Sequence, residues 1–102
     1  MIVEAEVQMT RYSVVNNRLV ETVTTPKIGF KITEAVGEKW LHFDRGYESM
    51  PLARVPEAIE AGGWCANAGA PPVCVNGKWG GHVYSKIVVP AESLKILLKE
   101  LR

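Results

Sequence analysis

Apolar and polar residues alternate at the start of the chain, and this alternation is the strongest evidence for the fold. The apolar positions Val3, Ala5, Val7 and Met9 are interleaved with polar ones, Glu4, Glu6, Gln8 and Thr10. An apolar side chain at every second position is typical of a strand with one buried face. Residues 2 to 14 are therefore predicted to form a half-buried strand.

Turn signals and β-branched runs continue this pattern along the chain. Asn16 and Asn17 predict a tight turn, because Asn tolerates a positive φ. Further strands are predicted at residues 19–24, 27–33, 39–44, 47–50 and 82–89. Because neighbouring residues of a strand point to opposite faces, we expect Leu41 and Phe43 to face the core. The opposite face of that strand would then carry Trp40, His42 and Asp44.

Two helices are predicted, one in the middle of the chain and one at its end. Pro56 suits a first helical turn and Gly62 a C-terminal stop, which predicts a short helix at residues 55–61. Pro90 precedes a second helix with an apolar stripe of leucines, Leu94, Leu97, Leu98 and Leu101. A three-turn helix is marginal alone, so the stripe packs on the sheet or on a partner subunit, and we expect an oligomer interface there.

These elements predict an α+β fold, with a mostly antiparallel sheet of four to six strands and two helices packed on one face. A length of 102 residues indicates one domain, residues 1–102. The chain shows neither an apolar run of about 18 residues nor the pattern of a signal peptide, so a soluble, cytoplasmic protein is expected. The single Gln and the abundance of Val, Glu and Lys fit a thermophile.

The segment GGWCANAGAPPVCVNGKWGGH, residues 62–82, concentrates residues that often carry chemistry. Zinc on Cys65, Cys74, His82 and His42 is disfavoured, because the cysteines do not form the tight pair typical of structural zinc sites. A Cys65–Cys74 disulfide and two free buried thiols both remain open. GKWGG lacks the context of a phosphate-binding loop, and no catalytic motif surrounds Cys65 or Cys74. We therefore expect no catalytic residues, metal or cofactor. The segment is predicted to be an extended connection that Trp64 anchors to the core.

Every aromatic residue except Trp64 lies within two positions of a Lys or Arg. Basic groups beside aromatic rings are typical of proteins that bind single-stranded nucleic acid, where rings stack on bases and cations meet phosphates. The net charge of +1 requires such a binder to separate its twelve basic from its eleven acidic side chains. The predicted site comprises Lys39, Trp40, His42, Arg45, Tyr47, Lys78, Trp79, Tyr84 and Lys86. The alternative is a protein-interaction module with exposed aromatics.

The stretch KWLHFDRGYESMPLARVPEAIEA, followed by a strand and a leucine-rich helix, resembles the N-terminal DNA-binding domain of the ThermoDBP-related proteins of hyperthermophilic archaea. The resemblance lies in length, element order and basic-aromatic content. It implies binding of single-stranded DNA without sequence preference and along a sheet face. We expect RNA to be a less favoured ligand of the predicted site. The resemblance also implies a homo-oligomer, a dimer or tetramer, although only AESLKILLKELR stands where that family has a long zipper helix.

Overall fold

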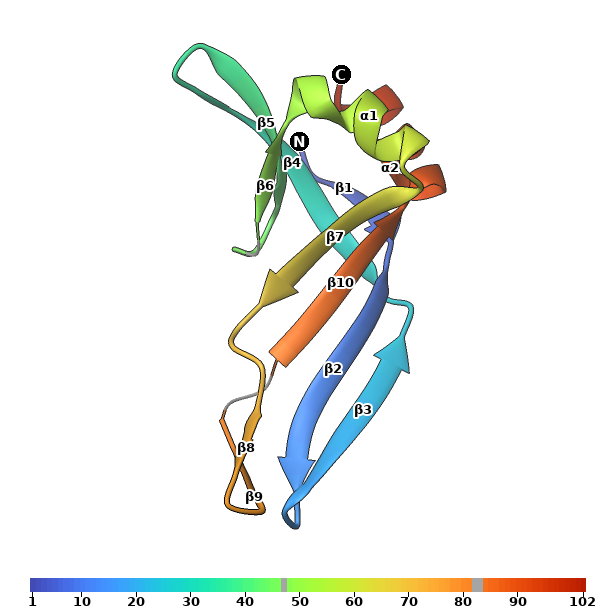
Figure 1. Cartoon of the computed structure of the whole chain (residues 1–102). Helices are drawn as coiled ribbons and strands as arrows, with labels where there is room; N and C mark the ends of the chain where they lie inside the picture. Colours follow the sequence, from blue (N-terminus) through green and yellow to red (C-terminus); the bar gives the residue numbers. More distant parts are fainter. Residues whose placement is uncertain (47, 82–83) are drawn as a thin grey trace.

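The computed structural model describes residues 1–46, 48–81 and 84–102, and this part holds ten strands and two α-helices (Figure 1). The head sheet has the order β1-β4-β5-β6. Its strands are β1 (Val3–Glu6), β4 (Lys27–Ala35), β5 (Glu38–Phe43) and β6 (Ser49–Pro51). The arm sheet has the order β3-β2-β10-β7. Its strands are β2 (Gln8–Val15), β3 (Arg18–Thr24), β7 (Gly63–Ala68) and β10 (Tyr84–Pro90).

The remaining elements are a small hairpin and the helices. The hairpin joins β8 (Val73–Val75) to β9 (Lys78–Gly80), and all strand pairs described are antiparallel. The helices are α1 (Val55–Glu60), preceded by a 3₁₀ turn at Leu52–Arg54, and α2 (Ala91–Leu101). The predicted α+β class, with antiparallel strands and two helices, is confirmed. The prediction of a single sheet of four to six strands is wrong, because the described strands form two four-stranded sheets and a two-stranded hairpin.

One bent hairpin supplies strands to both sheets. β1 continues into β2 through Val7, and β3 continues into β4 through Thr25 and Pro26. The N–H of Val7 donates to the carbonyl of Pro26 at 3.0 Å, which holds the two bends together. Proline has no N–H to give to a ladder, so the regular pairing of β2 with β3 stops here and that of β1 with β4 begins.

The inner faces of both sheets pack on one core. Phe43 of the head sheet lies with its ring centroid 4.7 Å from that of Phe30 and 4.9 Å from that of Trp64 in β7. Leu41 and Phe43 are buried, as their alternation predicts, and Trp64 is half-buried against the same cluster. The predicted orientation of β5 and the predicted anchoring by Trp64 are therefore confirmed.

The leucine stripe of α2 packs on its own chain. Leu94 and Leu97 are fully buried in the core, and Leu98 and Leu101 are partly buried against it. α1 and α2 contact each other and close the end of the core away from the arm (Figure 1). Leu94 and Leu97 are therefore not available for the predicted oligomer interface, whereas for the partly buried Leu98 and Leu101 that interface stays a prediction.

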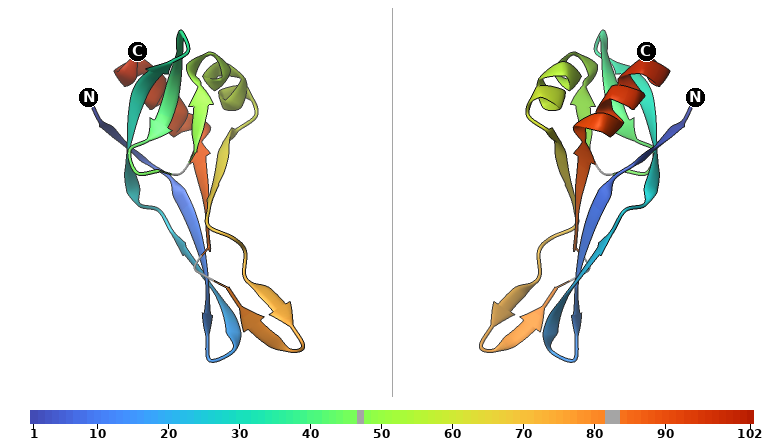
Figure 2. Two further views of the ribbon diagram at one scale, coloured as in Figure 1. Left: turned by 90° about the vertical axis from the view of Figure 1, so that its left-hand side faces the viewer. Right: turned by 90° about the vertical axis from the view of Figure 1, so that its right-hand side faces the viewer.

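Below the core, the molecule continues as an arm. We define the arm as residues 10–24, 67–81 and 84–88, so that it contains most of the β2–β3 hairpin, the β8–β9 hairpin and the lower part of β10, and we call the rest of the described chain the head (Figure 2). The radius of gyration is 15.7 Å, against about 13 Å for a compact domain of this length. The accessible surface is 6763 Å², against about 5,700 Å² for a monomer of this mass. The arm thus exposes more surface than folding of the head requires.

The segment of residues 62–82 contains more regular structure than the predicted extended connection. β7 pairs with β10 along its full length, and β8 and β9 form a hairpin whose turn, Asn76 and Gly77, has φ angles of 52° and 75°. Turns with two positive φ angles favour Asn-Gly. The local sequence shows no clear periodicity here, because β7 consists mostly of small residues and is held by pairing with β10, about twenty residues away.

Candidate nucleic-acid interface

The predicted site residues lie on three separate surfaces. Trp40 and His42 are on the outer face of the head sheet, and Tyr84 and Lys86 are on the outer face of the arm sheet. Lys78 and Trp79 are on β9, Lys39 is exposed on β5, and Arg45 lines a pocket. Tyr47 lies outside the described residues.

A single groove containing all these residues is therefore excluded by the arrangement of the sheets. The inner faces of the head and arm sheets meet in one core, so their outer faces point away from each other. The sequence prediction of one groove is wrong. Strand alternation places a residue on one face or the other of its own strand, but it does not say which faces of distant strands meet.

Contacts within the head sheet account for the position of Trp40. Its indole N–H donates to the backbone carbonyl of Ala35 at 3.4 Å, and its cross-strand neighbours are Thr33 and Pro51. The ring is half-buried. These contacts hold Trp40 beside the β4–β5 turn, so its presence on the outer face does not require a ligand.

On the arm, two tyrosines form a pair that sequence analysis did not identify. Tyr12 of β2 lies directly opposite Tyr84 of β10. Their ring centroids are 5.8 Å apart and the planes are inclined by 25°, a stacked arrangement. The Tyr84 hydroxyl donates to Oδ1 of Asn67 at 2.7 Å, which fixes the orientation of that ring. Both rings are half-buried, so each keeps part of its surface open to solvent.

Lys86 flanks this pair on the same face of the sheet. It follows Tyr84 by two residues in β10 and is opposite Thr10 and Asn67 on the neighbouring strands. Residues two apart in a strand share a face, so Tyr84 and Lys86 project from the same face of β10. Glu21 lies opposite Tyr12 on this face, and the carboxylate of Glu48 accepts the backbone N–H of Asn67 at 3.4 Å. We call the surface formed by Tyr12, Tyr84, Lys86 and Asn67 the tyrosine face.

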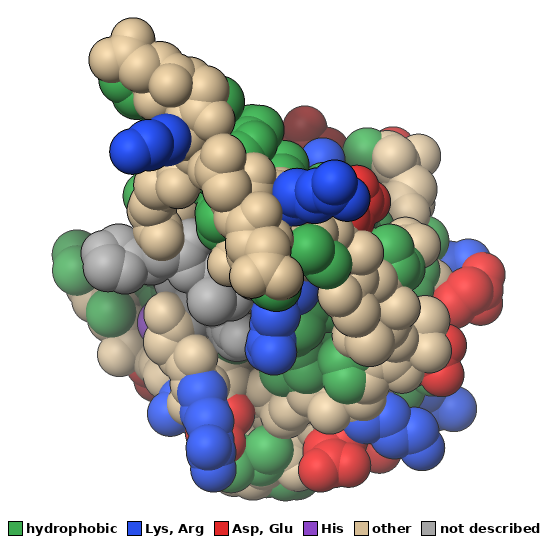
Figure 3. Space-filling view, turned by 90° about the horizontal axis from the view of Figure 1, so that it is seen from below, with side chains coloured by type: hydrophobic (Ala, Val, Ile, Leu, Met, Phe, Trp, Pro, Cys, Tyr) green, Lys and Arg blue, Asp and Glu red, His purple; other side chains and the backbone are tan. Residues whose placement is uncertain are grey.

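The charges of the chain are segregated between arm and head. The arm carries four basic side chains and one acidic one, namely Arg11, Arg18, Lys78 and Lys86 against Glu21, whereas the rest of the chain carries eight basic and ten acidic ones. Viewed onto the end of the arm, Lys and Arg side chains surround hydrophobic ones, and most Asp and Glu side chains lie toward the edge (Figure 3). The separation of charge required of a nucleic-acid binder is therefore present.

Asn17 ties the two hairpins of the arm together. Its side-chain N–H donates to the carbonyl of Gly77 at 3.0 Å, and its Oδ1 accepts the backbone N–H of Trp79 at 2.9 Å. Asn17 itself has a φ of 56°, which Asn adopts more readily than most residues. This clamp places the β8–β9 turn, which Lys78 follows, beside the β2–β3 turn, which Arg18 follows.

The cysteines are free. Cys65 in β7 and Cys74 in β8 are both exposed thiols. They lie on different sheets, with Val88 and Trp79 as their respective cross-strand neighbours, so the considered disulfide is not formed and the alternative of buried thiols is wrong as well. His82 lies outside the described residues, and among those that are described no group of three His, Cys, Asp or Glu is placed to hold a metal ion.

Comparison of this chain with protein-family models, curated proteins and solved structures finds no match. The resemblance to ThermoDBP-related proteins therefore stays a prediction that these comparisons leave without support. Within the residues that the structure describes, no helix is long and apolar enough to cross a membrane.

Proposed function

We propose that the arm binds single-stranded nucleic acid, preferably DNA, without sequence preference and in the cytoplasm. The observation that carries this proposal is the stacked pair of Tyr12 and Tyr84, partly open to solvent and flanked by Lys86. Every base presents a π-face, and stacking of a base on an aromatic side chain contributes about 1–3 kcal/mol. The pair offers such a surface on the part of the chain where positive charge is concentrated.

The basic residues of the arm would supply contacts with phosphates. Lys86 lies on the tyrosine face, and Arg18 and Lys78 lie at the tip that Asn17 clamps. Neutralisation of phosphates by Lys and Arg releases counterions, so binding of this kind weakens steeply as salt increases. Trp40 and His42 are not part of the proposed site, because they lie on the outer face of the other sheet.

The test is a titration of fluorescent oligo-dT, followed by anisotropy at several salt concentrations. Lys86→Gln should weaken binding and reduce its dependence on salt, since one phosphate contact is lost. Lys99→Gln, which removes an exposed charge on α2, is the matched control and should change neither. A dissociation constant no better than about 10⁻⁴ M at low salt, typical of weak non-specific binding, would contradict the proposal. Oligo-U and duplex DNA of the same length test the preference for single-stranded DNA.

A second candidate function is self-association through the free edge of β3. Among the described strands β3 pairs only with β2, and all seven of its residues are exposed, including Leu19, Val20 and Val23. β3 also carries the charged residues Arg18 and Glu21, but an exposed edge strand of seven residues without Pro or Lys is a template for pairing with another strand. The surface in excess of a compact monomer, about 1,000 Å², is comparable with the roughly 800 Å² that each partner buries in a stable complex.

This candidate predicts a dimer in which two β3 strands pair. Val20 points away from the tyrosine face, so Val20→Lys should abolish the dimer in light scattering while leaving Tyr12 and Tyr84 in place. If the dimer persists in light scattering both in the Val20→Lys variant and in the presence of oligo-dT, the interface lies elsewhere.

A further inference from the structure

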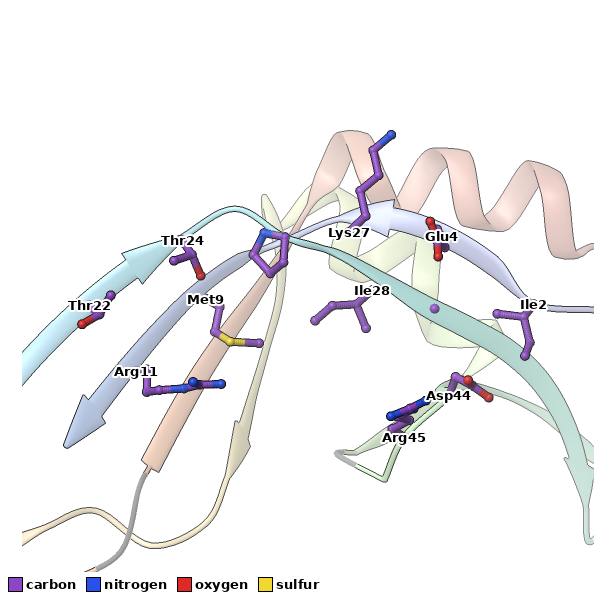
Figure 4. A pocket seen from close by; sticks show the side chains of 12 residues that line it. Ile2, Glu4, Met9, Arg11, Thr22, Thr24, Lys27, Ile28, Asp44 and Arg45 are labelled. Atoms are coloured by element: carbon purple, nitrogen blue, oxygen red, sulfur yellow. The ribbon is translucent and has the colours of Figure 1, made fainter.

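A pocket of about 690 Å³ lies where the bent hairpin passes from the arm to the head. Its walls come from β1 and β4, from β2 and β3, and from the turn after β5 that carries Asp44 and Arg45 (Figure 4). This pocket is separate from the tyrosine face. Arg11, which lines it, and Tyr12 are neighbours in β2 and therefore point to opposite faces of the sheet.

The floor of the pocket is apolar. Met9 and Ile28 belong to or pack against the hydrophobic core, and Ile2 and Pro26 extend this surface on either side. Ile2 is exposed, with 55% of its surface accessible. Small-molecule sites in proteins typically combine a mainly apolar wall with a few polar groups in a volume of about 300–1,000 Å³, and this pocket has that size and lining.

Two arginines provide the polar groups. The side chain of Arg11 extends from β2 into the pocket, and Arg45 lines the pocket from the turn after β5 (Figure 4). Across the described residues, neither arginine has a carboxylate within ion-pair distance; the pairs there are Lys31 with Asp44, at 3.7 Å, and Lys95 with Glu92. The side chains of Lys27 and Glu4 lie on the other side of the pocket from the two arginines (Figure 4). The pocket thus presents two arginines without an ion pair among the described residues, beside the Lys31-paired Asp44.

Close packing around Gly29 holds Arg45 in this position. The carbonyl of Gly29 accepts the N–H of Asp44 at 2.8 Å, which fixes the turn against β4. A Cβ atom added at Gly29 would lie 2.9 Å from Cγ2 of Ile2 and 3.4 Å from Cβ of Asp44. The absence of a side chain therefore lets the N-terminal segment and the Asp44–Arg45 turn approach the same strand, so both walls of the pocket depend on this glycine.

We propose that this pocket binds a small amphipathic anion, with its carboxylate held between Arg11 and Arg45 and its apolar body over Met9 and Ile28. Guanidinium groups bind carboxylates through paired, charge-assisted hydrogen bonds. An anionic head group would pair with the guanidinium groups, and an apolar chain would cover the floor. This ligand class goes beyond the proposed binding of nucleic acid and uses the opposite face of β2.

Isothermal titration calorimetry with octanoate tests the proposal, with 1-octanol as the neutral analogue of equal chain length. We expect octanoate to bind and to raise the melting temperature, and octanol to bind much more weakly. Arg11→Gln and Arg45→Gln should each weaken octanoate binding by about tenfold or more, as expected for loss of hydrogen bonds to a charged group. Lys27→Gln is the matched control, because its side chain lines the pocket but points away from the arginines.

Equal affinity for octanoate and octanol, or unchanged binding in both arginine variants, would overturn the proposal. Octyl phosphate in place of octanoate decides whether the head group is a carboxylate in particular or an anion in general. Circular dichroism of each variant confirms that it is folded. Tyr84→Ala should leave octanoate binding intact whether or not the arm binds nucleic acid, so the failure of one proposal can be told from the failure of the other.

Discussion

The head and the arm differ in what holds them together. The head buries Phe30, Phe43 and the leucines of α2 in one core, whereas β3 in the arm has no buried residue and the tips of the two hairpins are joined through the side chain of Asn17. Folding needs the head, so its side chains are explained by packing. The arm contributes surface, positive charge and paired tyrosines that packing alone does not explain, which is why we place the function there.

The largest effect is expected from a core substitution in the head. Phe30 is fully buried, so Phe30→Ala should lower the free energy of unfolding by about 3–5 kcal/mol. Val23→Ala on the exposed edge of the arm should change it by no more than about 0.5 kcal/mol. Chemical denaturation measures both, and similar costs at the two positions would break the distinction between head and arm.

The next effect concerns the tyrosine pair. Tyr84→Ala should weaken oligo-dT binding by about 1–3 kcal/mol, because one stacking surface is lost. Tyr84→Phe separates stacking from the hydrogen bond to Asn67 and should retain most of the affinity. If the alanine variant binds as tightly as the wild type in fluorescence anisotropy, the tyrosine face is not the binding surface.

A turn in the head offers a stabilising substitution. Val36 has a φ of 53°, and β-branched residues are rare in this region. The two turns of the arm place Asn at comparable positions, Asn16 and Asn76. Val36→Asn should therefore raise the free energy of unfolding by about 1 kcal/mol, since a left-handed conformation costs most residues about 1–2 kcal/mol. A decrease in melting temperature would show that Val36 has a role beyond the turn.

Removal of the Asn17 side chain should loosen the arm and spare the head. Asn17→Gly keeps a residue that tolerates positive φ but deletes both hydrogen bonds to the β8–β9 hairpin. Each such bond contributes about 0.5–1.5 kcal/mol. Hydrogen exchange should accelerate at the amide of Trp79, with exchange of core amides in β4 and β5 unchanged. Uniform acceleration across the chain would mean that the clamp supports the whole fold.

The smallest effect is expected at Glu21. This carboxylate lies opposite Tyr12, where it would repel a phosphate backbone. Glu21→Gln should strengthen oligo-dT binding by less than about 1 kcal/mol, as for other exposed charges, and the gain should vanish at high salt. A loss of affinity would indicate that Glu21 contacts the ligand directly.

Much of the head could be predicted from the sequence, because its signals are local. Alternation placed Leu41 and Phe43 inward, and Pro56, Gly62 and Pro90 marked the two helices. The leucine stripe was correctly predicted to be helical, but periodicity alone could not say whether it packs within the chain or between subunits.

The candidate site was less predictable, since it depends on long-range pairing. Tyr12 and Tyr84 are adjacent only because β2 and β10 pair in one particular register. The opposite orientation of the outer faces, which removes Trp40 from the site, follows from how the two sheets meet. The strand β7 is specified by its partner and not by its own glycines and alanines.

The most direct test compares two aromatic residues on the two regions in one oligo-dT titration. The account predicts that Tyr12→Ala on the arm weakens binding by about tenfold, within the range expected for one lost stacking contact, and that Trp40→Phe on the head leaves it unchanged. Loss of binding in the Trp40 variant, with Tyr12→Ala unaffected, would contradict the account and return the site to the outer face of the head sheet.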